Sequence, residues 1–186
     1  WFYHDEKEQQ SFVAVVDCTG HGVPGGFMSM LGYELLENIV AERRIYRPDV
    51  VLEEMDKGIV RLLKQKNSNT IVRDGMEMSF VRVDHLKRRL VYSGARSSII
   101  IERQGEIIEY KPTKHSIGSF EDEVENEFEK QTINYQSADK LYLFTDGFID
   151  QFGGIQGKKY YKNRFKNLLS SNSRNNLKSI KNNLTS

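Results

Sequence analysis

Short apolar runs alternate along the chain with stretches of helical periodicity, and this pattern predicts a mixed α and β fold. Residues 11–17 (SFVAVVD) and 141–144 (LYLF) are typical of buried strands, and each run leads into a glycine-containing turn. Between residues 76 and 101 apolar side chains recur at every second position, which predicts further strands joined by tight turns. Residues 124–135 have the pattern of an exposed strand.

Two amphipathic helices are predicted between the first strand and the strands that follow. The first covers residues 24–42. Its apolar residues recur every four positions at Val23, Phe27, Leu31, Leu35 and Ile39, and Met28, Leu36 and Val40 widen this apolar face. The second covers residues 48–65. The chain from Lys158 onward is basic and rich in Asn and Ser, and its lysines over residues 158–166 are typical of a solvated helix. This order favours a sandwich of antiparallel sheets and helices over a parallel doubly wound sheet.

Composition narrows the class of protein further. A chain of 186 residues with 38% hydrophobic side chains is long enough for one domain, residues 1–186, with a substantial core. Its 27 basic and 26 acidic residues nearly balance, so charge gives no support for nucleic-acid binding or a polybasic membrane anchor. The single cysteine, Cys18, excludes an intrachain disulfide framework and fits a reducing cytosol.

Two predicted strands are followed by an aspartate and a tight turn, at Asp17 and at Asp146. A carboxylate at the end of a buried strand is costly unless positive charge meets it, and a nearby glycine lets backbone carbonyls approach the same point. Either motif alone also fits an ordinary turn. If the two carboxylates converge, they form an oxygen-lined site suited to Mg²⁺ or Mn²⁺.

The glycine-rich residues 18–26 also have a competing interpretation as a phosphate cradle at the start of a helix. They lack the Gly-Lys-Ser/Thr ending of a P-loop, and their spacing differs from that of a dinucleotide-binding fingerprint. The sequence therefore gives little support for a nucleotide site.

Three segments resemble the SpoIIE-type branch of the metal-dependent PPM (protein phosphatase 2C) family. They are DCTGHGVPGGFMSMLG (residues 17–32), YSGARSSIII (residues 92–101) and LYLFTDGFIDQFGG (residues 141–154), in the order in which the family has them. The resemblance implies an α+β fold, a four-layer α-β-β-α sandwich of two antiparallel sheets. It also implies that the domain removes phosphate from phosphoserine or phosphothreonine in bacterial proteins.

The family's metal site can be carried over residue by residue. Asp17 is similar to the carboxylate that bridges two Mg²⁺ or Mn²⁺ ions, the carbonyl of Cys18 matches the backbone ligand after it, and Asp146 matches a later aspartate that binds one ion. Asp17 and Asp146 are thus the expected catalytic residues. Two such cations activate a water molecule and offset charge on the phosphoryl oxygens.

The sequence departs from the family at both ends. The family begins with a Gly-Asp-Phe-Tyr/Trp motif and ends with Asp-Asp-x-Thr, whereas this chain starts at Trp1 and has no such motif after Asp146. We therefore expect a fragment, truncated at both ends, that binds metal weakly or not at all. An unpaired edge of a truncated sheet would favour a homodimer.

Several other residues admit a catalytic interpretation beside a simpler one. His21 lies four residues after Asp17, where a role in capping or bracing the loop is favoured over proton donation. Asp150 fits a solvated helix carboxylate, and Arg96 fits a surface arginine better than a residue that faces the substrate phosphate. Cys18 lacks a patterned histidine base, which argues against a thiol nucleophile.

The resemblance implies a cytoplasmic serine/threonine phosphatase that forms the output domain of a longer sensor protein. Its expected substrate is a phosphorylated regulatory protein, a STAS-type anti-sigma antagonist. The alternative is a phosphatase-like module that has lost its chemistry and binds a partner, which is what missing terminal aspartates would predict.

Overall fold

A computed structural model describes residues 1–64, 75–118, 127–153 and 158–185. The chain forms two compact units, one made of Trp1–Ser98 and Lys111–Tyr135, the other of Ile99–Tyr110 and Gln136–Ser186. Within these described ranges no helix is long and apolar enough to cross a membrane.

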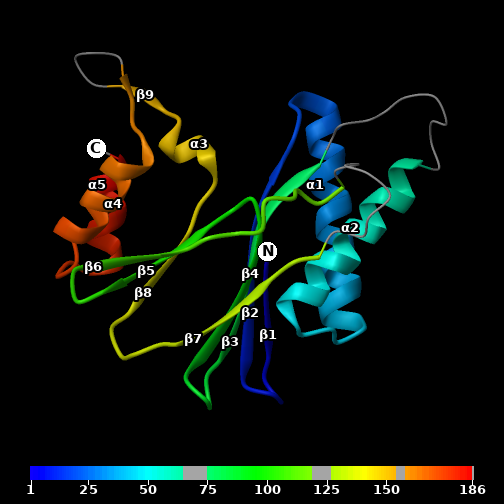
Figure 1. The fold of residues 1–186 in the computed structure, drawn as a ribbon, viewed down its shortest axis with the longest axis horizontal. Helices are drawn as coiled ribbons and strands as arrows, with labels where there is room; N and C mark the ends of the chain where they lie inside the picture. The colour runs from blue at the N-terminus through cyan, green and yellow to red at the C-terminus, as the bar shows by residue number, and fades with distance from the viewer. Residues whose placement is uncertain (65–74, 119–126, 154–157, 186) are drawn as a thin grey trace. The chain divides into compact units, whose positions relative to one another are not determined.

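The first unit is built on a five-stranded antiparallel sheet in the order β1-β2-β3-β4-β7 (Figure 1). Its strands are β1 Phe2–Asp5, β2 Gln10–Cys18, β3 Met76–Asp84, β4 Arg89–Ala95 and β7 Lys130–Asn134. The prediction of a buried strand over residues 11–17 is confirmed by β2. The exposed strand predicted over residues 124–135 is present as the shorter β7, and residues 124–126 lie outside the described residues.

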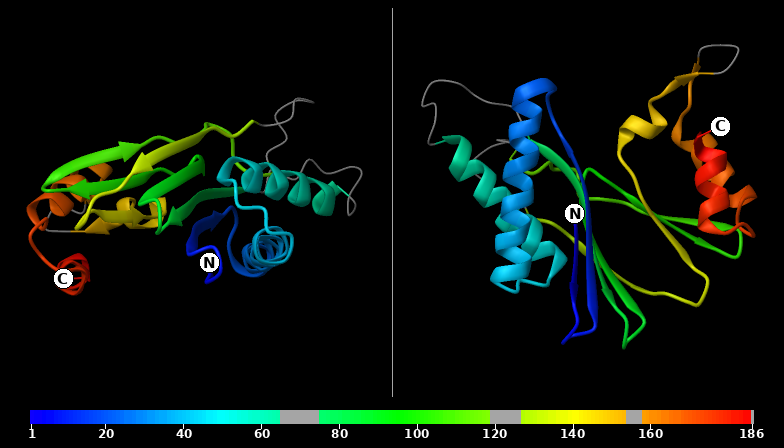
Figure 2. Two further views of the ribbon diagram at one scale, coloured as in Figure 1. Left: turned by 90° about the horizontal axis from the view of Figure 1, so that it is seen from below. Right: turned by 180° about the vertical axis from the view of Figure 1, so that it is seen from behind.

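Two long helices, α1 Gly22–Leu36 and α2 Pro48–Lys64, and the short π-helix η1 Glu37–Glu42 pack on one face of this sheet (Figure 2). Strand side chains alternate between faces, so Phe12, Ala14 and Phe80 share the helix-covered face. A shared core cluster joins them to Leu36, η1 and α2. The opposite face carries the residues at odd positions of β2 and β3.

The predicted apolar face of the first helix is confirmed in part. Met28, Leu36, Ile39 and Val40 are buried, whereas Val23 and Phe27, at the start of the helix, are exposed. The pattern did not predict the role of Gly32, which is also buried. A Cβ at Gly32 would lie 3.1 Å from the Met76 side chain, so the absence of a side chain there allows α1 to pack closely on β3.

The second unit has a three-stranded antiparallel sheet in the order β6-β5-β8 and a two-stranded pair β9-β10. Its elements are β5 Ile99–Arg103, β6 Glu106–Tyr110, β8 Lys140–Leu143, α3 Asp146–Ile149, β9 Phe152–Gly153, β10 Lys158–Lys159, α4 Lys162–Ser171 and α5 Leu177–Thr185. A cluster of Ile100, Phe165 and Leu169 packs α4 against the sheet.

The solvated helix predicted over residues 158–166 is wrong in two respects. Lys158 and Lys159 lie in β10, and α4 begins only at Lys162. Lys162 and Lys166 both form ion pairs with Glu109 of β6, the second at 2.6 Å. These lysines therefore attach α4 to the sheet. The chain contains the two antiparallel sheets expected from the family resemblance.

Candidate functional site

The candidate site begins at the end of β2, where Asp17 lies on the sheet face opposite α1 and α2. Its side chain is partly buried, and its direct neighbour across the antiparallel pair is Glu77 of β3. Residues directly opposite each other in such a pair place their side chains on the same face, with Cβ atoms about 4.5–5.5 Å apart. Two carboxylates therefore stand side by side at this end of the sheet.

The loop after Asp17 is fixed by Thr19. The Thr19 Oγ1 donates a hydrogen bond to the Gly75 carbonyl at 3.0 Å and accepts one from the Gly75 N–H at 2.7 Å. The backbone N–H of Thr19 also bonds to that carbonyl at 3.0 Å. These bonds tie the loop to the start of β3, so Asp17 and Cys18 are held in a defined place.

Glycines shape the remainder of this loop. Gly20 and Gly22 have positive φ angles of 99° and 65°, in the left-handed region that favours glycine. A Cβ at Gly25 would lie 2.9 Å from the Gly20 carbonyl oxygen, closer than real contacts allow. The glycines therefore allow the loop backbone to turn tightly and to pack closely against the start of α1.

Sequence reasoning missed Glu77, because its place beside Asp17 depends on strand register. The one signal in the sequence was Glu77 itself, a charged residue between Met76 and Met78 at the start of a predicted strand. Glu77 forms an ion pair with Arg96, whose Nε lies 3.0 Å from Oε1. Arg96, which was expected at the surface, is half-exposed and belongs to the same row of side chains.

Asp146 is the first residue of α3 and is exposed. Its carbonyl accepts a hydrogen bond from the Asp150 N–H at 2.8 Å, which closes this single helical turn. Asp17 belongs to the first unit and Asp146 to the second, so the convergence of the two carboxylates stays a prediction. Asp150, which was expected to be a solvated helix carboxylate, lies at the end of α3 with 43% of its side chain exposed, and it pairs with Lys159 at 2.6 Å.

The surroundings of His21 and Cys18 give no support for a catalytic role. His21 is the N-cap residue of α1, but its side chain makes no capping hydrogen bond, so of the two expected roles the cap is wrong and the bracing of the loop stays a prediction. The Cys18 thiol borders a cavity of about 150 Å³ under α1 and lies 3.6 Å from the Ser29 hydroxyl, which donates to it. Burial raises the pKa of this thiol, which disfavours the thiolate form that a nucleophile needs.

The donor set at the end of β2 fits a hard divalent cation. Carboxylate oxygens of Asp17 and Glu77 and the backbone carbonyl of Cys18 are the ligand types that Mg²⁺ and Mn²⁺ prefer, and Mg²⁺ commonly keeps several water ligands. Within the described ranges, no three His, Cys, Asp or Glu side chains come together closely enough to hold a metal ion.

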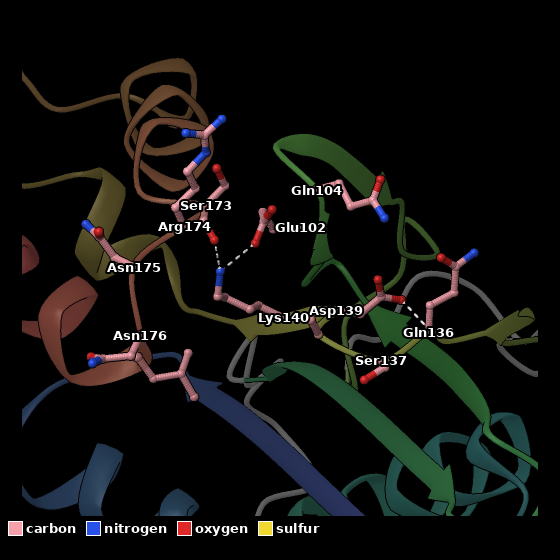
Figure 3. A pocket seen from close by; sticks show the side chains of 12 residues that line it. Glu102, Gln104, Gln136, Ser137, Asp139, Lys140, Ser173, Arg174, Asn175 and Asn176 are labelled. Atoms are coloured by element: carbon pink, nitrogen blue, oxygen red, sulfur yellow. Dashed lines mark hydrogen bonds and ion pairs between the residues drawn. The ribbon is translucent and has the colours of Figure 1, made fainter.

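A larger hollow of about 710 Å³ lies in the second unit, and none of its lining residues is a candidate site residue from the sequence (Figure 3). The Lys140 ammonium lies at its wall, where it pairs with Glu102 at 2.9 Å and donates to the Ser173 carbonyl. Asp139, in the same wall, accepts from the Gln136 N–H at 2.8 Å and pairs with Arg103. Lys140 and Asp139 are thus each paired with an opposite charge of the protein itself, so these pairs stabilise the unit and do not indicate a ligand site.

Comparison with known proteins assigns the chain to a family. The family described as Stage II sporulation protein E (SpoIIE) matches residues 7–186. The phosphoserine phosphatase RsbP of Bacillus subtilis (strain 168) is 23% identical over 150 residues, and the match spans 80% of this chain and 35% of RsbP. This chain thus corresponds to about a third of that relative's length.

Solved structures show the same fold. The SiaA-PP2C domain of Pseudomonas aeruginosa superimposes with a TM-score of 0.83 at 27% identity, over 100% of this chain and 70% of that one. RsbX in complex with magnesium gives a TM-score of 0.64 at 18% identity, over 100% of this chain and 77% of RsbX. The expected PPM-type fold is confirmed, and the chain belongs to the SpoIIE family of PP2C-type proteins.

Proposed function

We propose that this chain is a metal-dependent protein serine/threonine phosphatase domain that hydrolyses phosphoserine or phosphothreonine on a regulatory protein. The observation that carries the proposal is the position of Asp17. It stands at the end of a central strand, beside a second carboxylate, in a loop that Thr19 and Gly75 hold in place. Membership of the SpoIIE family and similarity to the phosphatase RsbP supply the reaction class.

The proposed substrate is a phosphorylated STAS-type anti-sigma antagonist, and the proposed setting is the cytoplasmic output domain of a longer sensor protein. RsbP, which resembles this chain over part of its length, is a phosphoserine phosphatase. The near-neutral charge of the chain, with 27 basic and 26 acidic residues, suits recognition of a protein surface better than of a polyanion.

Asp17, the Cys18 carbonyl and Asp146 are the proposed metal ligands. When bound, an Mg²⁺ or Mn²⁺ pair supplies Lewis-acid activation of water and neutralises charge on the phosphoryl oxygens. The chain's own part is to fix the oxygen donors. The pairing of β2 with β3 places Asp17 on the sheet face opposite the helices, and the Thr19–Gly75 bonds tie the backbone just after Cys18 to the start of β3.

Hydrolysis of a phosphoserine peptide by the full-length protein, measured with Mn²⁺ and with EDTA, tests this function. We expect Asp17→Asn to lower kcat/KM by about a hundredfold or more, as loss of a key electrostatic group in an active site does. Asp150→Asn is the matched control, because Asp150 pairs with Lys159 and has no proposed ligand role.

Two results would contradict the proposal. Hydrolysis that continues in EDTA and in the Asp17→Asn protein would reject the metal-dependent mechanism. Absence of hydrolysis together with metal-independent binding of a phosphorylated partner would favour the alternative, a phosphatase-like module that acts by docking.

A further inference from the structure

Three charged side chains form a row across the end of the first sheet. Asp17 on β2 lies directly opposite Glu77 on β3, and the Arg96 guanidinium is bonded to Glu77. Arg96 follows the end of β4, and its backbone forms a bridge with Met78 of β3. Neighbouring strands are about 4.8 Å apart, so the row extends over only two strand spacings.

The charges in this row are unequal. Two carboxylates stand side by side, and like charges directly opposite each other in a sheet are destabilising. Arg96 offsets one of them through its Nε. A guanidinium has five N–H donors in a rigid fork, so Arg96 can exchange its contact with Glu77 for a bidentate pair with a doubly charged anion.

The backbone holds Arg96 in place for this bond. Its φ of 57° is in the left-handed region, which is costly for a residue other than glycine. Hydrogen bonds fix the turn: the Arg96 N–H donates to the Thr113 carbonyl at 2.9 Å, and the Ser97 N–H donates to the Ala95 carbonyl at 2.7 Å. The buried Tyr92 hydroxyl donates to the Ser97 carbonyl at 2.6 Å.

We propose that Arg96 binds the phosphoryl group of the substrate and that Glu77, its ion-pair partner, competes with the phosphate for the guanidinium. This inference rests on the proposed phosphatase function and names the residue that recognises phosphate. An arginine fork matches phosphate oxygens bidentately, which a lysine cannot do. Because the side chain of Arg96 is 56% exposed, the guanidinium is accessible to a substrate.

Glu77 and phosphate then compete for the same cation. In protein free of metal, Glu77 occupies the guanidinium edge that a phosphate would use. Removal of the Glu77 charge should therefore strengthen phosphate binding, while removal of Arg96 should abolish it. A merely structural ion pair predicts no change in phosphate affinity for either substitution.

Titration of inorganic phosphate into the protein in EDTA, followed by ³¹P NMR, measures this competition without catalysis. We expect Glu77→Gln to tighten phosphate binding about fivefold, the size of an exposed ion pair's contribution. Arg96→Ala should weaken it about tenfold or more, because a hydrogen bond to a charged group is lost. Arg96→Lys should retain an intermediate affinity.

Arg43→Ala is the matched control, since Arg43 is also half-exposed and also pairs with a glutamate, Glu54, at 2.6 Å. Its phosphate affinity should equal that of the unmodified protein. Phosphate binding that is equal in Arg96→Ala and Arg43→Ala, or that is absent in Glu77→Gln, would overturn the inference.

Kinetics with a phosphoserine peptide and Mn²⁺ separates this inference from the phosphatase proposal. If the unmodified protein hydrolyses the peptide, Arg96→Ala should raise KM, and an unchanged KM and kcat would overturn the role of Arg96 alone. If the unmodified protein shows no hydrolysis but Arg96→Ala still loses phosphate, the phosphatase function fails and Arg96 stands as a phosphate-binding residue.

Discussion

The described parts of the two units differ in the size of their apolar clusters, although both contain ion pairs. In the described part of the first unit, sixteen apolar residues are buried in one cluster between the sheet and the helices. In the second unit, the cluster that joins α4 to the sheet has three buried residues, and ion pairs connect the elements around it. These pairs are Lys140–Glu102, Arg103–Asp139, Lys162–Glu109, Lys166–Glu109 and Lys159–Asp150.

This difference matters for the two candidate carboxylates. Apolar burial changes little with pH or salt, whereas ion pairs weaken when a partner is protonated or screened. Asp17 belongs to the unit with the larger apolar cluster, but that unit also holds buried carboxylates in ion pairs, at Asp5, Asp49 and Asp84. Asp146 begins a single helical turn whose end is tied by the pair between Asp150 and Lys159.

The largest expected effect is the loss of a buried cation in the second unit. Lys140 is 15% exposed and Glu102 only 2%, so Lys140→Met leaves a buried carboxylate without its cation. We expect a loss of about 3–5 kcal/mol in the free energy of unfolding, measured in urea. In the first unit, Arg43→Met breaks a more exposed pair and should cost at most about 1 kcal/mol.

A second substitution sharpens this test. Glu102→Gln added to Lys140→Met removes the uncompensated charge and should recover a large part of the loss. If Lys140→Met costs no more than Arg43→Met, the contrast between the two units is wrong.

The next largest effect on stability is expected from replacing one glycine in each unit by alanine. A Cβ at Gly94 would lie 2.0 Å from the Tyr92 hydroxyl oxygen and 2.5 Å from the Ser97 carbonyl oxygen. Gly94→Ala should therefore destabilise the protein by about 1–3 kcal/mol through overpacking. At Gly147 the nearest atom is the Thr145 hydroxyl at 3.5 Å, so Gly147→Ala should change stability by less than about 0.5 kcal/mol. Thermal unfolding of both variants checks this order.

A smaller difference in stability is expected between substitutions of Thr19, in the loop after β2, and of Thr145, before α3. Thr19→Val removes both side-chain hydrogen bonds with Gly75 and should cost about 1–2 kcal/mol. Thr145, the N-cap of α3, makes no side-chain capping bond, so Thr145→Val should be close to neutral. Hydrogen exchange of the Gly75 amide should quicken in the first variant. Equal stability of the two variants would show that the loop at Asp17 is not held by Thr19.

The smallest expected effect is on the pH dependence of stability, through Glu109. Burial alone would raise the pKa of Glu109, but hydrogen bonds and charges from Lys162 and Lys166 outweigh it and lower the pKa to about 2 from 4.5. A lowered folded-state pKa gives stability that is complete above the unfolded value and is lost as pH falls from about 4.5 to 2.

Glu109→Gln should therefore cost about 1 kcal/mol at pH 7, and this difference should shrink below pH 4. Urea unfolding of both proteins across this pH range measures it. A cost that is independent of pH would show that the Glu109 carboxylate does not fasten α4 to β6 by charge.

Strand positions followed from the sequence more readily than the site did. The apolar run before Asp17 and the alternation from Met76 onward are local patterns, and β2 and β3 confirm them. The partner of Asp17 could not be predicted, because Glu77 becomes its neighbour only through a register set sixty residues apart in the chain. Arg96 was expected at the surface, and its side chain is indeed 56% exposed, but its pair with Glu77 also depends on how the strands are aligned.

Helix α1 shows a second limit of local patterns. Periodicity predicted Met28 and Leu36 on the apolar face, and both are buried, but it could not predict that Gly32 packs against Met76, because glycine contributes no apolar signal. Charge contacts such as those of Glu109 depend on which strand α4 covers, which is again a matter of tertiary structure.

The brevity of β8 bears on self-association. This strand lies at one end of the sheet order β6-β5-β8 and has four residues, beginning with the ion-paired Lys140. So short a strand offers few backbone hydrogen bonds to a strand of a second chain, and the charged residue at its start disfavours edge-to-edge pairing. A homodimer joined there would fall apart on dilution, and sedimentation at rising concentration would reveal a gradual shift in mass.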